Sequence, residues 1–122
     1  MSNYKLDLSE RLLAFAAASI KLSATLTVTY AGKYIAGQLL RSACSAGANY
    51  EEACGAESRA DFIHKLQIVL KELKESLYWL RLAGKSSLLK SDDRTLTEEA
   101  TSLVNIIAKS VITAKRNKLG NE

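Results

Sequence analysis

The sequence contains no proline, two cysteines and one histidine among its 122 residues. Because proline breaks helix interiors, its absence permits long uninterrupted helices. Cys44 and Cys54 would be separated by about 15 Å of rise if they lie on one helix, too far apart for a disulfide. Two thiols and His64 are also too few ligands for a closed zinc site. We therefore expect both cysteines to be reduced packing residues in a cytoplasmic protein.

Long hydrophobic runs are also missing. The apolar stretch from Leu12 to Ser19 (LLAFAAAS) is far shorter than the ~20 residues that span a bilayer. Asp7 and Glu10 precede it and Lys21 follows, so it does not fit a signal peptide. We expect no membrane contact, and interpret the stretch as the core face of an amphipathic helix.

Charge of one sign is in only mild excess, with 17 basic and 13 acidic residues and a formal net charge of +4. The two signs are interleaved through most of the chain, whereas a dedicated nucleic-acid binder often carries concentrated basic runs. Only the C-terminal end is clearly basic, through Lys109, Lys115, Arg116 and Lys118. This tail is either a solvated last turn that complements the helix dipole or a set of phosphate contacts.

Hydrophobic periodicity predicts four helices, over residues 8–23, 31–54, 59–83 and 95–117. The short connections between them favour an all-α, up-down-up-down four-helix bundle. No linker or internal repeat is visible, so the whole chain, residues 1–122, is expected to be one domain.

Local signals set the expected helix ends. Asp7, Ser58 and Thr95, each with an acid three residues later, are the expected N-caps of the first, third and fourth helices. Gly55 offers a left-handed exit from the second helix, and Gly84 lies just past the third. The segment 25–29 is Thr-rich and would also suit a strand, but an isolated strand has nothing to pair with.

Two of the predicted helices carry polar side chains at helical spacing where a bundle core would normally hold leucine. One stripe lies on residues 31–54 and the other on 59–83, each beside an apolar stripe. The polar residues are Gln38, Ser42, Ser45, Asn49 and Glu52, and then Asp61, Lys65, Glu72, Glu75 and Trp79. Since buried polar groups must be hydrogen-bonded, matched stripes predict a shared network, either inside the bundle or between subunits.

Catalytic constellations are absent from the pattern. A di-metal carboxylate site in a bundle needs two Glu-x-x-His pairs, whereas here Asp61 alone stands three residues before His64. Neither Ser42 nor Cys44 has a histidine within reach on its own helix, and no glycine-rich phosphate loop is present. We expect no enzymatic activity, no metal and no cofactor.

Aromatic residues are also few, and two of them, Tyr78 and Trp79, come near the end of the third helix. They either pack at the end of the bundle or contact a partner or second subunit.

Three blocks of the chain carry a family resemblance in their order, spacing and residue types. They are residues 38–53 (QLLRSACSAGANYEEA), 58–66 (SRADFIHKL) and 70–80 (LKELKESLYWL). These blocks resemble the four-helix bundle proteins encoded in 23S rRNA intervening sequences, and the resemblance extends from Leu12 to about Lys115. The chain departs from the pattern at Cys44, where threonine is common, and after Leu26, where the usual proline is missing.

The resemblance implies a left-handed bundle that assembles as a homopentamer with a central opening, in the bacterial cytoplasm and without an established enzymatic activity. A related group serves as accessory variability proteins of diversity-generating retroelements, where a basic pentamer contacts a reverse transcriptase and nucleic acid. Two hypotheses follow. The first is a non-catalytic oligomeric helical scaffold with weak RNA or DNA binding, which multivalency would strengthen. The second is a protein-binding adaptor, such as a reverse-transcriptase accessory protein.

Overall fold

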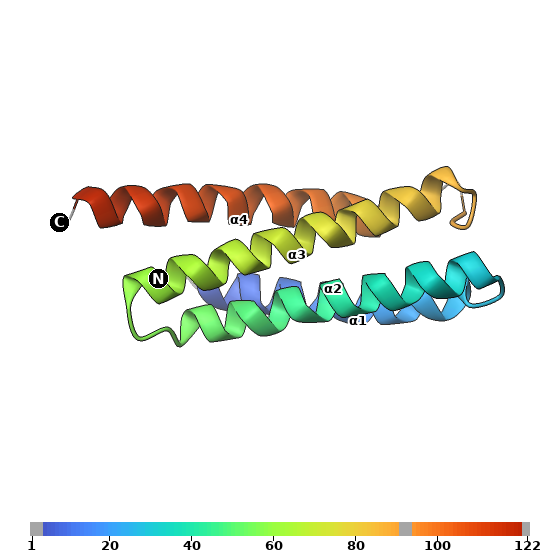
Figure 1. Cartoon of the computed structure of the whole chain (residues 1–122), viewed down its shortest axis with the longest axis horizontal. Coiled ribbons are helices and arrows are strands. Elements are labelled where there is room, and N and C mark those ends of the chain that lie inside the picture. The colour runs from blue at the N-terminus through green and yellow to red at the C-terminus, as the bar shows by residue number, and fades with distance from the viewer. Residues whose placement is uncertain (1–3, 91–93, 121–122) are drawn as a thin grey trace.

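Four antiparallel helices make up the computed structural model, which describes residues 4–90 and 94–120, and the side chains of 7–90 and 94–117 (Figure 1). They are α1 (Tyr4–Leu26), α2 (Tyr30–Cys54), α3 (Arg59–Lys85) and α4 (Thr95–Gly120). Both chain ends lie at one end of the assembly of helices (Figure 1). The predicted all-α class and the number of helices are confirmed for the described residues.

The first helix is longer than predicted at both ends. It begins at Tyr4, so Asp7 lies inside its first turn and the predicted cap at Asp7 is wrong. It continues to Leu26, and α2 follows after a short turn, which excludes a strand at 25–29. Thr29 caps α2, because its side-chain oxygen accepts a hydrogen bond from the Gly32 amide at 2.9 Å.

The other helix ends agree in part with the sequence signals. Ser58 caps α3 as predicted, accepting from the Asp61 amide at 3.0 Å. Gly55 ends α2 with φ −98° and ψ 11°, so the predicted left-handed exit is wrong. The third helix continues one residue beyond Gly84, to Lys85. Among the described non-glycine residues, Ser87 alone has a positive φ, of 63°, in the loop that follows.

The fourth helix begins at Thr95 itself, so the predicted cap at Thr95 is one residue late. The backbone carbonyl of Arg94 accepts a hydrogen bond from the Glu98 amide at 2.9 Å. This bond places the cap position at Arg94.

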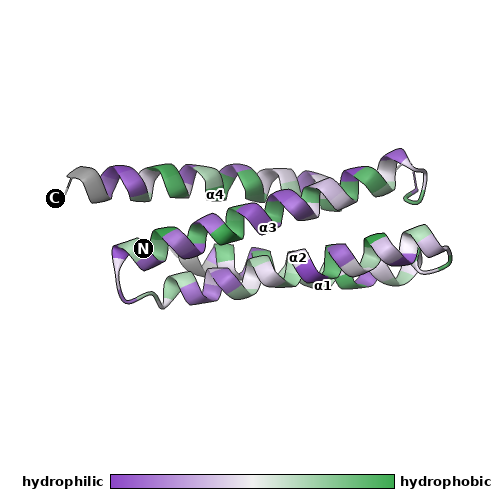
Figure 2. Ribbon diagram, viewed as in Figure 1, coloured by the Kyte–Doolittle hydropathy of each residue, from purple (hydrophilic) through white to green (hydrophobic). Residues whose placement is uncertain are grey.

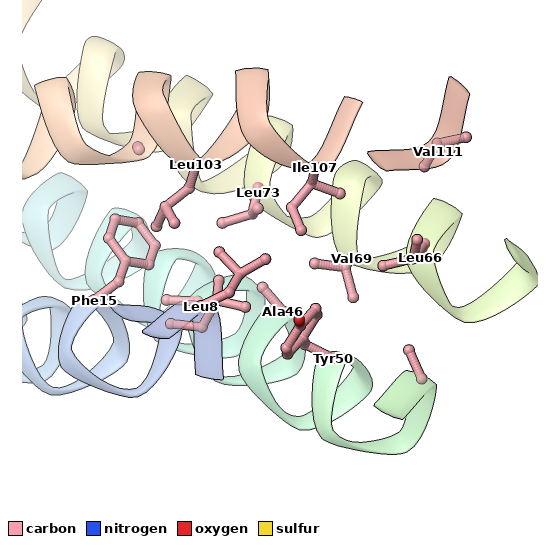
Figure 3. Packing of buried hydrophobic residues seen from close by; sticks show 14 of the residues in the cluster. Leu8, Phe15, Ala46, Tyr50, Leu66, Val69, Leu73, Leu103, Ile107 and Val111 are labelled. Atoms are coloured by element: carbon pink, nitrogen blue, oxygen red, sulfur yellow. The ribbon is translucent and has the colours of Figure 1, made fainter. Parts of the chain in front are cut away.

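All four helices contribute to the main hydrophobic core, and a smaller buried cluster comprises Leu26, Ile35, Ala36 and Ala83. Hydrophobic and hydrophilic residues alternate along each helix (Figure 2), and the buried apolar side chains point inward between the helices (Figure 3). The largest fully buried apolar residues are Leu12, Phe15, Leu39, Leu66, Val69, Leu73, Leu80, Leu103 and Ile107. Burying each such side chain contributes about 1.5–3 kcal/mol, so this core is the main source of stability.

The helices do not pack equally. Neighbours in sequence pack against one another extensively. Within the described residues, α1 and α4 have the sparsest contact of the helix pairs that touch, and the diagonal pairs α1/α3 and α2/α4 do not meet. Between them lies a hollow of about 760 Å³, lined by Phe15, Leu22 and Leu96 among others. Next to this hollow, Arg11 of α1 donates to both carboxylate oxygens of Glu99 of α4, at 2.8 and 3.0 Å, and so links the two helices.

Gly47 marks the close approach of α1 and α2 that its small neighbours predict. A Cβ atom added there would lie 3.7 Å from the Leu12 carbonyl oxygen, in ordinary van der Waals contact.

Within the described residues, none of the helices combines the length and the apolar character that a membrane span requires.

Candidate polar seam and basic face

The two predicted polar stripes face each other across α2 and α3, and we call this region the α2–α3 seam. At one end, Lys65 Nζ lies 2.6 Å from Glu52 Oε1. The hydrogen bond and charge of Glu52 raise the pKa of Lys65, and the Asp61 carboxylate adds a smaller effect in the same direction. Because both partners are partly exposed, the pair stabilises the fold only modestly.

Further along the seam, Arg41 holds two carboxylates of α3. Its guanidinium donates to Glu72 Oε1 at 3.2 Å and also to Glu75 Oε2. Glu75 accepts a further hydrogen bond from Trp79 Nε1 at 3.1 Å. The Arg41 and Trp79 hydrogen bonds hold the pKa of Glu75 below its usual value, and the bond to Glu75 raises the pKa of Arg41. The side chain of Glu72 is only 12% exposed, so Arg41 compensates a charge that is largely removed from water.

A buried pair of hydroxyls lies at the centre of the seam. Ser42 Oγ and Ser76 Oγ are 2.8 Å apart, and both side chains are fully buried. Ser42 Oγ is also 3.3 Å from the Leu39 carbonyl oxygen, and Ser76 Oγ is 3.0 Å from that of Glu72. One hydroxyl therefore donates to its partner while the other donates to its own helix, and both groups are satisfied.

Three members of the predicted stripe form no side-chain hydrogen bond to α3 in the described part of the chain. The Asn49 side-chain amide donates to the Ser45 backbone oxygen at 2.9 Å and to Ser45 Oγ at 3.1 Å, both inside α2. Gln38 is half-buried, with no side-chain hydrogen bond in the described part of the chain. A contact of these residues with another subunit stays a prediction.

Sequence reasoning missed Arg41 and Ser76, although both complete the seam. Ser76 follows Glu72 by four residues and lies on the core side of the stripe, so the helical spacing alone could have included it. Arg41 lies at the outer edge of its stripe, and its long side chain reaches across to α3.

The seam predicts a dependence of stability on pH. A lowered pKa means that Glu75 stabilises the fold above its unfolded pKa, about 4.3, and that this contribution is lost as the pH falls through the lower, folded value. We expect the stability difference between the wild type and Arg41→Gln to shrink as the pH falls from about 6 to about 3. Urea unfolding at several pH values measures it. An exposed control, Arg81→Gln, should show no such trend, and an Arg41→Gln difference that is constant over this range would contradict the account.

Aromatic rings gather at the end of the seam. The ring of Trp79 makes edge contacts with Tyr34 and Tyr78, with centroid distances of 5.9 and 5.1 Å. Trp79 is half-buried, while both tyrosines remain 57% exposed. The cluster thus packs against the helices and also presents two aromatic rings to solvent.

The exposed side of α3 forms a second feature, which we call the α3 basic face. It comprises Lys71, Lys74, Arg81 and Lys85, with Tyr78 between them, and all five side chains are exposed. Their spacing of three, four or seven residues places them on one side of the helix, over about 21 Å. The α3 acids Glu72 and Glu75 both pair with Arg41 of α2, although Glu75 also lies one turn from Lys71, whose charge helps to lower its pKa.

The C-terminal tail does not form one comparable surface. Lys109 and Arg116 are exposed and seven residues apart, so they share a side of α4. Lys115 is exposed as well, but lies about 100° around the helix from Arg116. The side chain of Lys118 lies outside the described residues.

The cysteine prediction is half wrong. Cys54 is half-buried, as a packing residue would be, but Cys44 is exposed and lines the groove between α1 and α2. In the described part of the chain, no three His, Cys, Asp or Glu side chains gather as they would around a metal ion.

The sequence model of the 23S rRNA-intervening sequence protein family matches residues 4–109. The chain belongs to this family. The resemblance seen in the sequence is therefore confirmed. The α3 basic face and the whole α2–α3 seam lie inside the segment that matches the 23S rRNA-intervening sequence proteins, whereas Lys115, Arg116 and Lys118 follow it.

A solved structure supports the same assignment. The chain is 32% identical to a protein of unknown function from the S23 ribosomal protein family of Bacteroides thetaiotaomicron VPI-5482, known from its crystal structure. The match covers 85% of this chain and 97% of the other, with a TM-score of 0.79. No protein among those with curated functions matches the chain.

Proposed function

We propose that this protein is a non-catalytic, homo-oligomeric helical scaffold of the cytoplasm that binds single-stranded nucleic acid weakly through the α3 basic face. The separation of charge on α3 carries the proposal. The acids on the α2 side are occupied, because Arg41 holds Glu72 and Glu75. The cations on the other side are left exposed to solvent.

The α3 basic face has the two components that single-strand binding needs. Cations along a surface neutralise successive phosphates, and an aromatic ring between them offers a stacking platform for a base. Tyr78 is 57% exposed and lies between Lys74 and Arg81 in the helical order. Because stacking needs an unpaired base, the ring favours single strands over duplexes.

Assembly would turn this weak surface into an effective one. We propose a homopentamer of left-handed bundles, as the family resemblance implies. Five copies would present five basic faces, and linked sites raise the overall affinity without any new contact.

The proposal predicts which cations matter. Lys74→Ala/Arg81→Ala removes one lysine and one arginine from the α3 basic face, and Lys115→Ala/Arg116→Ala removes the same pair from the tail. Fluorescence anisotropy with a labelled single-stranded RNA should show at least about tenfold weaker binding for the first variant, because two phosphate contacts are lost from each copy. The tail variant should bind within about twofold of the wild type.

The same experiment can contradict the proposal. If the tail variant loses affinity while the α3 variant binds like the wild type, the phosphate contacts lie on α4 instead. Circular dichroism should be unchanged in both variants, and binding should be compared at protein concentrations at which light-scattering mass shows both to be fully assembled, so that a loss of binding reports the surface and not the fold or the assembly.

A protein-binding adaptor, for example for a reverse transcriptase, is the second candidate. The exposed rings of Tyr34 and Tyr78 beside Trp79 favour it, since tyrosine and tryptophan dominate the energetics of protein interfaces. Capture of one specific protein that persists at high salt and is lost in Tyr78→Ala would support this candidate. Binding that disappears with salt would favour nucleic acid.

A further inference from the structure

Helices α1 and α4 each carry charges of both signs on the side turned away from the core, among them one acid and one base that are three turns apart; exposed Asp7, three residues before Glu10, adds an acid on α1. Glu10 and Lys21 are exposed on α1, and Glu98 and Lys109 are exposed on α4. In each helix the two charges are eleven residues apart, which is about three turns and about 16.5 Å along the same side. None of the four forms an ion pair among the described residues.

The two helices run antiparallel, and their charges lie at matching heights along the bundle. Lys21 and Glu98 line the same hollow between α1 and α4. A second hollow, toward the other end of α1 and α4, is lined by Lys109 and by Leu8. Leu8 lies about half a helical turn before Glu10. Each acid on one helix is therefore level with the base on the other.

The residues between these charges permit close packing. On α1 they include Ala14 and Ala17, and on α4 Thr101 and Asn105, all exposed and uncharged. Small residues let two helix backbones approach, so that the longer charged side chains at the ends can meet. We call these two surfaces the α1 stripe (Glu10, Ala14, Ala17, Lys21) and the α4 stripe (Glu98, Thr101, Asn105, Lys109).

Neighbouring charges strengthen the match. Glu51 of α2 lines the same outer groove as Glu10 and adds an acid at that end. Arg116 shares a side of α4 with Lys109 and adds a base at the corresponding end. The α1 stripe is thus acidic at its Glu10 end, and the α4 stripe is basic at its Lys109 end, which lies at the same height.

We propose that the α1 stripe of one copy packs against the α4 stripe of a neighbouring, parallel copy, with Glu10 opposite Lys109 and Lys21 opposite Glu98. The inference rests on the proposed homo-oligomer and names its interface. Because the two stripes lie on different helices, the contact is head-to-tail and repeats from copy to copy. Such contacts form a ring when the rotation closes, whereas a contact of one stripe with itself stops at a dimer.

Charge reversal tests the pairing directly. Lys109→Glu places a like charge opposite Glu10, and should raise the concentration at which the oligomer dissociates at least about tenfold. The double variant Glu10→Lys/Lys109→Glu should return this concentration to within about threefold of the wild type, because the pair is restored with its signs exchanged. The matched control is Lys115→Glu, which makes the same change on another side of α4 and should assemble normally. Light-scattering mass over a dilution series at low salt measures all four proteins.

Each other outcome overturns a defined part of the account. A wild type that is monomeric at every concentration removes the proposed homo-oligomer and this interface with it. A wild type that assembles while Lys109→Glu dissociates at an unchanged concentration leaves the oligomer standing but places its interface elsewhere. One more outcome is that assembly of Glu10→Lys is restored by Lys21→Glu instead of by Lys109→Glu. In that case α1 of one copy pairs with α1 of a second copy, and the proposed α1–α4 contact is wrong.

Discussion

Replacing Gly32 with alanine is expected to lower the melting temperature by about 5–15 °C. Gly32 lies in the first turn of α2, directly beside the end of α1. An added Cβ would overlap the backbone carbonyl oxygen of Leu26 and lie 2.9 Å from Thr29 Oγ1. Neither is the end of a flexible side chain, so the α1–α2 turn must open and the Thr29 cap of α2 is weakened.

The matched control for this change is Gly37→Ala on the same helix. Gly37 is exposed, and no heavy atom lies within 4 Å of its added Cβ. Alanine is the better helix former, so this variant should gain about 0.5–1 kcal/mol. Thermal unfolding followed by circular dichroism measures both. A Gly32→Ala protein that melts at or above the wild-type temperature would show that the turn adapts freely.

Replacing Leu12 with alanine should cost about 2–5 kcal/mol, the second large effect. Leu12 is 1% exposed in the centre of the core, and its backbone runs beside Gly47 of α2. Because α1 and α2 are already close at this point, they have little room to move together and fill the cavity. The loss should therefore lie toward the upper part of that range.

The neighbouring residue supplies the control. Leu13→Ala deletes the same atoms from a side chain that is 64% exposed, and should change the stability by less than about 0.5 kcal/mol. Urea unfolding of the two variants at low protein concentration gives both differences. Equal losses would mean that α1 is rotated relative to the core described above.

Most of the helical architecture was predictable, because the 3.6-residue period alone separates core from surface. Where the predicted ends failed, the reason was local. Gly55 leaves its helix without the left-handed conformation, and Thr29, which no sequence signal singled out, caps α2. The sequence does not distinguish Gly32 from Gly37. Only the position of the α1 backbone shows that a Cβ atom would clash at Gly32 and not at Gly37.

The candidate surfaces were less predictable than the helices. Periodicity shows which residues share a side of a helix, but it does not show which neighbour that side meets. Glu52 and Lys65 could be matched across two stripes, while Arg41 could not, because its guanidinium extends well beyond its own Cα position. The α3 basic face was missed for a related reason. Its cations alternate with acids along the sequence, and the two signs lie on different sides only once the helix has formed.

The central claim, that the exposed α3 face binds single-stranded nucleic acid, is tested most directly by the salt dependence of binding. The measurement is fluorescence anisotropy of labelled single-stranded RNA with the wild-type protein, and duplex DNA as a second probe, from low to physiological salt. If the four cations of one face neutralise four phosphates, the logarithm of affinity should fall against the logarithm of salt with a slope of about −3, steeper if several copies bind one strand. The single strand should bind more tightly than the duplex. Absence of binding to either probe at low salt, or binding that does not change with salt, would contradict the claim and turn the search to protein partners.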